Sequence, residues 1–135
     1  MDEYRAHFER VYCRAPIVTF DGIPVRFRKS DFDHCMQKTA RGGSGEKIGW
    51  ATDRLERIDW IKATLEHAHA ELYFGWDNKR RVTARSRRVA VVFGRYVVVV
   101  AILWRSQDME GRFITAYPAD ESGIARIRTM PQWRR

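Results

Sequence analysis

The sequence predicts an α+β domain in which N-terminal helices pack on one face of an antiparallel β-sheet. Two observations lead to this fold class. Apolar residues recur at helical spacing through much of the first half of the chain, whereas the second half contains β-prone runs without intervening helices. Segregation of helices from strands is typical of α+β domains, whose helices cover one face of the sheet. We therefore expect the other face of the sheet to be open.

A single domain over residues 1–135 is expected. A chain of this length can bury one hydrophobic core without metals or disulfides. With 44% hydrophobic and 13% aromatic residues, the composition is that of a globular protein and not of a disordered chain. No repeat, low-complexity tract or long linker divides the sequence.

The sequence favours a reduced, cytoplasmic protein without a cofactor. Cys13 and Cys35 are the two cysteines; they match no metal-ligand spacing, and one possible bridge is a weak basis for a disulfide scaffold. The N-terminal residues 1–5 are polar, with no apolar segment behind them that would indicate a signal peptide. The longest apolar run, residues 96–104, is too short to span a bilayer. We therefore expect no membrane association.

The N-terminal third is expected to form a helix and a β-hairpin. Residues 1–14 carry apolar side chains at an approximately helical spacing. The β-prone runs at residues 17–20 and 23–27 flank an Asp-Gly pair, which is a strong hairpin signal. Because Pro24 cannot donate a hydrogen bond to a neighbouring strand, we expect its strand at an edge of the sheet.

A second helix is expected from Asp31 to about Thr39. Ser30 stands in the N-cap position, and Asp33 follows three residues later, as in a capping box. The Arg-Gly-Gly-Ser-Gly segment at residues 41–45 ends this helix. A phosphate-binding loop follows a strand, and none precedes this segment, so we interpret it as a flap.

A third helix and a four-stranded meander complete the predicted fold. The helix begins near Thr52 or Asp53 and runs to about His67, with apolar residues at helical spacing along one face. The predicted strands cover residues 72–76, 89–93, 96–104 and 112–117. A Gly-Arg pair at residues 94–95 serves as a two-residue turn between the two central strands.

The positive charge of the chain indicates a nucleic-acid partner. The formal net charge is +8, and arginines outnumber lysines. A guanidinium group can bind phosphate through two parallel hydrogen bonds. Basic residues cluster within one ten-residue segment, at Lys79, Arg80, Arg81, Arg85, Arg87 and Arg88. An ordinary solvated surface is the alternative, but this clustering favours the docking of a polyanion.

The last predicted strand presents candidate phosphate ligands. If Ile114 and Ala116 face the helices, the alternation of a strand places Phe113, Thr115 and Tyr117 on the exposed face. Both hydroxyls could donate to one phosphate, and an aromatic ring offers a surface on which a base can stack. Threonine and tyrosine are also good strand formers, and the pattern taken alone is better explained by that preference.

His34 is the histidine best placed for chemistry. At about 100° per residue it lies roughly opposite Phe32 on the second helix, so it faces solvent or a cleft and not the core. A plain surface histidine is the alternative. The other histidines, His7, His67 and His69, lack ligand spacing with one another or with a carboxylate pair, so no metal site is expected.

Five segments carry a resemblance to a known group of enzymes. In chain order they are Val25-Arg26-Phe27, Asp31-Phe32-Asp33-His34, Arg54-Leu55-Glu56-Arg57-Ile58-Asp59-Trp60-Ile61, Tyr96-Val97-Val98-Val99-Val100 and Phe113-Ile114-Thr115-Ala116-Tyr117. Together they resemble the phage-associated nucleases of the barnase, EndoU, colicin E5/D and RelE-like (BECR) fold group. The likeness covers residues 17–117. Its most distinctive parts are the Arg-Ile-x-Trp-Ile helix and the Phe-x-Thr-Ala-Tyr strand.

The resemblance implies a metal-independent endoribonuclease of the toxin type, of phage or prophage origin. In this chemistry a ribose 2′-hydroxyl attacks the adjacent phosphate, which leaves a 2′,3′-cyclic phosphate and a free 5′-hydroxyl. The implied substrate is RNA, with transfer RNA as one candidate. A host would need an acidic immunity protein or antitoxin to mask a surface of net charge +8. The resemblance also implies that the protein acts in the cytoplasm, with delivery from another cell or a phage as one route.

This reaction requires a base, cationic donors for the phosphorane and an acid for the leaving oxygen. His34 is the expected base or acid, because imidazole titrates near neutral pH. Arg57 flanks the apolar stripe of its helix and is the expected phosphate ligand. Arg54 lies near the middle of that stripe, where an arginine is unusual unless it lines the cleft. Thr115 and Tyr117 would position the phosphate, and Tyr117 could serve as the acid.

A basic module that binds nucleic acid without cutting it is the alternative function. Such a module would bind with a steep salt dependence and leave the nucleic acid intact. A third possibility is an interaction protein that has kept the fold and lost the chemistry, since a fold does not determine a function.

Overall fold

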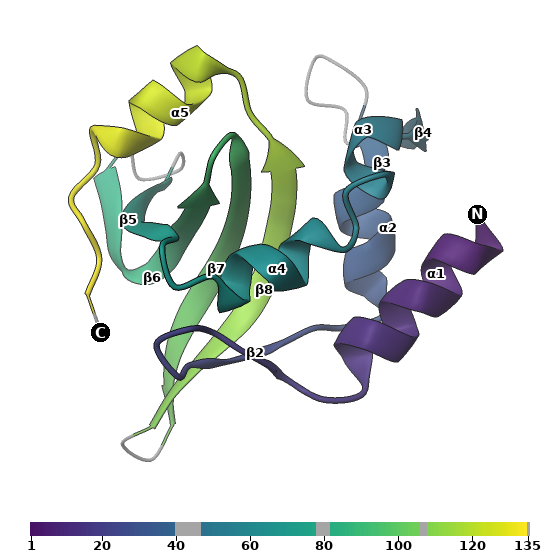
Figure 1. Cartoon of the computed structure of the whole chain (residues 1–135), viewed down its shortest axis with the longest axis horizontal. Helices are drawn as coiled ribbons and strands as arrows, with labels where there is room; N and C mark the ends of the chain where they lie inside the picture. Colours follow the sequence, from purple (N-terminus) through teal and green to yellow (C-terminus); the bar gives the residue numbers. More distant parts are fainter. Residues whose placement is uncertain (40–46, 78–81, 106–107, 135) are drawn as a thin grey trace.

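The computed structural model describes residues 1–39, 47–77, 82–105 and 108–134. It has the predicted α+β class, with a six-stranded mixed sheet and five α-helices in these ranges (Figure 1). The helices are α1 (Asp2–Phe8), which continues as a π-helix (Glu9–Cys13), α2 (Ser30–Met36), α3 (Thr52–Leu55), α4 (Trp60–Glu66) and α5 (Glu121–Arg128). None of the described helices is long and apolar enough to cross a membrane.

The main sheet combines the predicted meander with the predicted hairpin. The meander strands are β5 (Glu71–Asp77), β6 (Val82–Phe93), β7 (Tyr96–Arg105) and β8 (Asp108–Pro118), and the hairpin strands are β1 (Ile17–Val18) and β2 (Pro24–Arg26). The strand order is β1-β2-β8-β7-β6-β5, and β2 runs parallel to β8. A separate pair, β3 (Gln37–Thr39) and β4 (Lys47–Trp50), flanks the glycine-rich segment. The expectation that no strand precedes this segment is therefore wrong, and the predicted flap at residues 41–45 lies outside the described residues. The predicted Gly-Arg turn joins β6 to β7, with Gly94 at φ 61°.

The expected edge position of Pro24 is wrong, because β2 lies between β1 and β8. Pro24 is the first residue of its strand, and pairing with β8 begins only at Val25, opposite Gly111. The missing N–H of the proline is therefore not needed in the ladder. Gly111 permits the close approach, since a Cβ at this position would lie 3.0 Å from Cγ2 of Val25.

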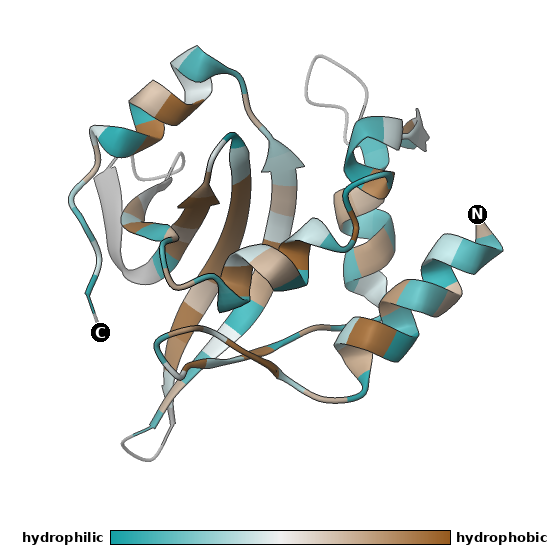
Figure 2. Ribbon diagram, viewed as in Figure 1, coloured by the Kyte–Doolittle hydropathy of each residue, from teal (hydrophilic) through white to brown (hydrophobic). Residues whose placement is uncertain are grey.

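An aromatic core fills the space between the sheet and the N-terminal helices. Its fully buried rings include Phe8, Phe32 and Phe113, and the Phe113 ring stacks on Phe27 at a centroid distance of 4.7 Å. Figure 2 shows apolar residues on β7, on the coloured part of β6 and on α4. Burial of this apolar surface is the main term that holds the helices to the sheet.

The expectation that Phe113 lies on the exposed face is wrong. Val99 pairs with Thr115 but Val100 pairs with Phe113, so β8 has one extra residue at a β-bulge. A bulge shifts the alternation of side chains by one residue. Phe113 therefore turns into the core, as Ala116 does, while Thr115 is half-buried, with its hydroxyl 3.7 Å from the Cys35 sulfur.

The second face of the sheet is partly covered and not open as expected. Helix α5, for which the sequence analysis had no prediction, packs Ile124 against Val92 and Val97 of the sheet. Asp120 caps this helix, because its Oδ1 accepts a hydrogen bond from the Gly123 N–H at 2.7 Å. The partly buried Tyr117 packs against the same cluster.

The second predicted helix ends earlier than expected. It stops at Met36, and the chain continues into β3, so Thr39 belongs to a strand. The predicted capping box is also wrong, since Lys29 is the N-cap residue. Asp33 instead forms an ion pair with Arg5 of α1 at 2.7 Å, and Arg5 lowers the pKa of its carboxyl.

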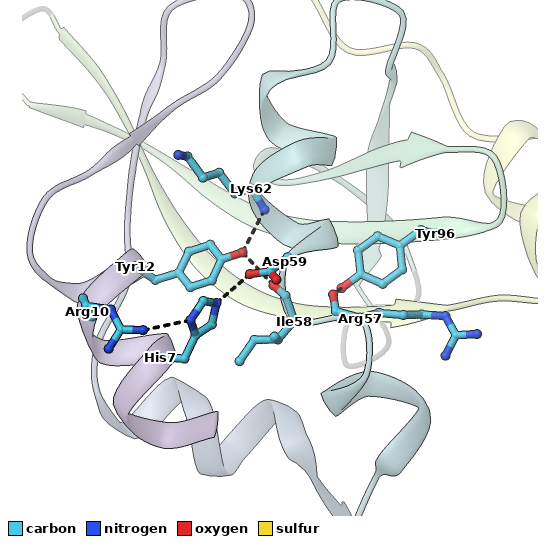
Figure 3. Close-up of polar contacts among 8 residues, drawn as sticks. All are labelled: His7, Arg10, Tyr12, Arg57, Ile58, Asp59, Lys62 and Tyr96. Carbon is cyan, nitrogen blue, oxygen red and sulfur yellow. Dashed lines mark hydrogen bonds and ion pairs between the residues drawn. The ribbon is translucent and has the colours of Figure 1, made fainter. Parts of the chain in front are cut away.

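The third predicted helix is interrupted between α3 and α4, and two tyrosine hydroxyls bind the interruption (Figure 3). The Tyr12 hydroxyl donates to the Ile58 carbonyl at 2.6 Å and accepts from the Lys62 N–H at 3.0 Å. From the sheet side, the Tyr96 hydroxyl donates to the Arg57 carbonyl at 3.4 Å. Burial raises the pKa of both tyrosines, so both hydroxyls remain protonated donors. Both acceptors lie in the interruption itself, and the Arg57 carbonyl also accepts from the Trp60 N–H at 2.9 Å.

We predict that Tyr12→Phe destabilises the protein by about 1–3 kcal/mol, because it leaves the buried Ile58 carbonyl without its donor. Denaturant unfolding of the wild type and the variant measures the difference. Tyr4→Phe is the matched control, since the half-exposed Tyr4 has no hydroxyl hydrogen bond within the described part of the chain. Equal stability of the two variants would show that the Tyr12 hydroxyl does not hold the interruption.

Candidate functional site

The structure brings together three of the predicted site residues where α3 packs against β8. Nη1 of Arg54 donates to the Cys35 carbonyl at 2.9 Å and lies 3.5 Å from Oγ1 of Thr115. The Arg54 guanidinium carbon also lies 5.5 Å from the centroid of the Tyr117 ring. Arg54, Thr115 and Tyr117, with the Cys35 carbonyl, are called the Arg54 cluster below.

Cys35, which the sequence analysis did not assign, connects α2 to this part of β8. Its buried thiol lies 3.4 Å from the Ala116 carbonyl, and the Thr115 hydroxyl lies 3.7 Å from its sulfur. Its carbonyl, near the C-terminal end of α2, accepts from Arg54. A cation is favourable at this position, because unpaired carbonyls give a helix C-terminus a partial negative charge. No spacing in the sequence connects Cys35 with Arg54.

The Arg54 cluster has the electrostatics of an anion site. Among the described residues, no partner is present for Nε and Nη2 of Arg54, so these donors are available to a ligand. Burial raises the pKa of Tyr117, and nearby Arg54 lowers it by a smaller amount. The tyrosine hydroxyl therefore stays protonated at neutral pH and can donate a hydrogen bond. A half-buried guanidinium beside two hydroxyls fits a phosphate group.

His34 is exposed on α2, as predicted. It makes no hydrogen bond or ion pair with any residue that the structure describes. It precedes Cys35, whose carbonyl binds Arg54, so both residues belong to the same turn of helix next to the cluster. The structure does not record a contact between the imidazole and Arg54, Thr115 or Tyr117.

Arg57, the expected phosphate ligand, makes its contacts elsewhere. Its Nη1 donates to the Asp53 carbonyl at 2.7 Å, and its guanidinium carbon lies 5.1 Å from the centroid of the Trp60 ring. Arg54, which was expected to line the cleft if it had a function, is the arginine that lies beside Thr115 and Tyr117. The interruption between α3 and α4 begins at residue 56, between these two arginines.

The predicted basic segment is only partly described. Lys79, Arg80 and Arg81 lie outside the described residues. Arg85 and Arg87 belong to β6, but the structure does not describe their side chains, whereas Arg88 is exposed on the same strand. These residues remain predicted nucleic-acid contacts.

A second polar cluster, which the sequence analysis missed, joins α1 to the interruption (Figure 3). Nε2 of His7 lies 2.6 Å from Oδ1 of Asp59, and Nη2 of Arg10 lies 3.2 Å from Nδ1 of the same ring. Because Arg10 can only donate, the imidazole accepts at Nδ1 and donates to Asp59 at Nε2. His7 and Asp59 are 52 residues apart, and no local pattern connects them.

This second cluster is a poor phosphate site. The adjoining cavity of about 330 Å³ is lined by two carboxylates, from Glu3 and Asp59, together with His7. Carboxylates repel a phosphate, and both ring nitrogens of His7 already have partners. Within the described ranges, no group of three or more histidine, cysteine or acidic side chains could hold a metal ion. The Arg54 cluster is therefore the better candidate for phosphate chemistry.

Comparison of the chain with models of protein families, with curated proteins and with solved structures found no match. The resemblance to the barnase, EndoU, colicin E5/D and RelE-like nucleases stays a prediction from the sequence. The geometry of the Arg54 cluster and the charge of the chain are the features of the molecule that bear on its function.

We predict that Arg54→Gln raises the pKa of Tyr117 further above its usual value. The guanidinium stabilises the tyrosinate, so its removal leaves only the effect of burial, which raises the pKa. An NMR titration that follows the ¹³Cζ shift of Tyr117 with pH measures the change. Arg57→Gln, which removes a guanidinium that contacts Trp60, should leave the titration unchanged. The reverse result would place Arg57 and not Arg54 beside the tyrosine.

Proposed function

We propose that the protein is a metal-independent endoribonuclease that cleaves RNA by attack of a 2′-hydroxyl on the adjacent phosphate. The supporting observation is Arg54, which is held by the Cys35 carbonyl beside Thr115 and Tyr117 and keeps two guanidinium nitrogens free among the described residues. The net charge of +8 would attract the polyanionic substrate. The resemblance to the barnase-like nucleases points to the same chemistry.

Each residue of the cluster would have a distinct role. Nε and Nη2 of Arg54 would bind two phosphate oxygens and stabilise the additional charge of the phosphorane. Thr115 would position the same phosphate. The protonated Tyr117 hydroxyl would donate a proton to the leaving 5′-oxygen, while the exposed His34 imidazole would accept the proton of the 2′-hydroxyl. The products are a 2′,3′-cyclic phosphate and a free 5′-hydroxyl, so no water is consumed in the cleavage step.

A second candidate function is a basic module that binds nucleic acid without cutting it. It is favoured by the absence of a described contact between His34 and the Arg54 cluster. Without a base, the cluster would hold a phosphate but would not activate the 2′-hydroxyl. Binding would then fall steeply with salt while the RNA stayed intact.

An acidic immunity protein or antitoxin belongs to the ribonuclease proposal. Unrestrained cleavage of RNA would harm the cell that makes the enzyme. A partner of opposite charge would associate rapidly with a chain of net charge +8 and cover the Arg54 cluster.

We predict that the purified protein cuts single-stranded RNA in excess chelator and leaves 2′,3′-cyclic phosphate ends. Arg54→Lys should slow cleavage by roughly 10²-fold, because an ammonium cannot reproduce the bidentate contact. His34→Ala should slow it by roughly 10²–10⁴-fold, which is the usual contribution of a general acid or base. Gel analysis of end-labelled RNA measures the rates, and enzymatic end-mapping identifies the termini.

Arg14→Lys and His69→Ala are the matched controls, since both native side chains are exposed and lie outside the cluster. Full activity in His34→Ala and Arg54→Lys would reject the assigned roles even if the RNA is cut. Intact RNA, together with salt-dependent binding, would reject the ribonuclease and support the binding module.

A further inference from the structure

An aromatic cavity of about 380 Å³ lies between α4 and the turn that joins β6 to β7. Its walls include Trp60, His67, Phe93 and Tyr96. Trp60 is 49% exposed and Phe93 is 44% exposed. Two large aromatic side chains that meet at one concave, solvent-accessible place indicate a binding site more than scattered surface residues do.

The rings of this cavity contact one another in pairs. The centroids of the His67 and Phe93 rings are 3.9 Å apart, with an interplanar angle of 31°. Trp60 contacts the buried Tyr96 edge to face, at a centroid distance of 5.5 Å. The Tyr96 hydroxyl is itself bound to the Arg57 carbonyl. The cavity therefore offers preformed flat aromatic surfaces, which suit a planar ligand.

Two arginine side chains lie beside the aromatic walls of the cavity. The Arg57 guanidinium lies over the Trp60 ring, and Arg95 lines the cavity while it pairs with Glu121 on α5. A purely apolar ligand would make no use of these charges. A nucleobase that carries a phosphate would stack on the rings and place its negative charge near the arginines.

The cavity and the Arg54 cluster lie at the same end of β7 and β8. Tyr96, in the wall of the cavity, is paired across the strands with Pro118. Tyr96 belongs to the core beneath the helices and Tyr117 packs against the cluster beneath α5, so the two rings lie on opposite faces of the sheet. Arg54 connects the two places, since its guanidinium lies over the Tyr117 ring. Both Arg54 and Arg57 act against the burial that raises the pKa of Tyr96, so both guanidinium groups are within electrostatic reach of its hydroxyl. A chain of nucleotides could therefore extend from one site to the other.

We infer that the aromatic cavity is a subsite for one unpaired base of the RNA whose phosphate binds to Arg54. The inference rests on the proposed function, because it assumes that RNA occupies the Arg54 cluster. It defines the substrate class as single-stranded RNA. Bases within a duplex are paired and stacked, and cannot enter a cavity of this kind unless they are splayed out.

Binding of a short, non-cleavable 2′-O-methyl oligonucleotide tests this inference without any need for catalysis. Fluorescence anisotropy should show that Phe93→Ala and Trp60→Ala each raise the Kd for the single strand by roughly 5- to 100-fold, as expected for the loss of one stacked base. Phe93→Tyr should keep the wild-type Kd, because it retains the ring. The matched control is Trp104→Ala, since Trp104 is 65% exposed and stands at the opposite end of β7. Thermal melting of each variant verifies that it is folded.

Three results would overturn the inference. These are equal Kd values for Phe93→Ala and Trp104→Ala, equal affinity of the wild type for the single strand and the matching duplex, or no loss of affinity in Trp60→Ala. Its failure is distinguishable from failure of the proposed function. Ring-dependent binding by a protein that leaves RNA intact would support the subsite and reject the ribonuclease. Cleavage of RNA with ring-independent binding would reject the subsite alone.

Discussion

The geometry of the candidate site depends on the buried hydroxyl of Tyr12. It binds the Ile58 carbonyl and the Lys62 N–H, and so it holds the interruption between α3 and α4. In a continuous helix, residues three positions apart are neighbours on the same face. The interruption instead separates the environments of Arg54 and Arg57. One guanidinium reaches β8, and the other lies over Trp60.

This arrangement explains how a cation can be half-buried beside a sheet. The Cys35 carbonyl accepts from Arg54, and the Tyr117 ring provides a face for its charge. These contacts compensate for part of the hydration free energy that the guanidinium loses on burial. Because neither partner is an anion, the positive charge is not neutralised within the cluster. In the proposed mechanism, that charge is available to a phosphate.

Much of the fold could be predicted because its signals are local. The Asp-Gly turn predicts the β1–β2 hairpin, and the apolar runs predict all four strands of the meander. The predictions that were wrong concern features that depend on contacts between residues far apart in the sequence. The bulge opposite Val99 and Val100 turns Phe113 into the core, and the Tyr12 hydroxyl binds an interruption in a segment whose helical periodicity is unbroken. The residue types of the site could be predicted, but not which of these residues contact one another. Arg57 was the expected phosphate ligand, whereas the guanidinium beside Thr115 belongs to Arg54. The position of each arginine depends on the interruption, which no local pattern indicates.

The position of Arg54 beside Tyr117 can be measured directly by nuclear Overhauser spectroscopy of the wild-type protein. The account predicts cross-peaks between the side-chain protons of Arg54 and the ring protons of Tyr117, and cross-peaks between Arg57 and the Trp60 indole. Cross-peaks from Arg57 to the Tyr117 ring, with none from Arg54, would show that the helix is not interrupted as described. That result would contradict the assignment of Arg54 as the phosphate-binding residue.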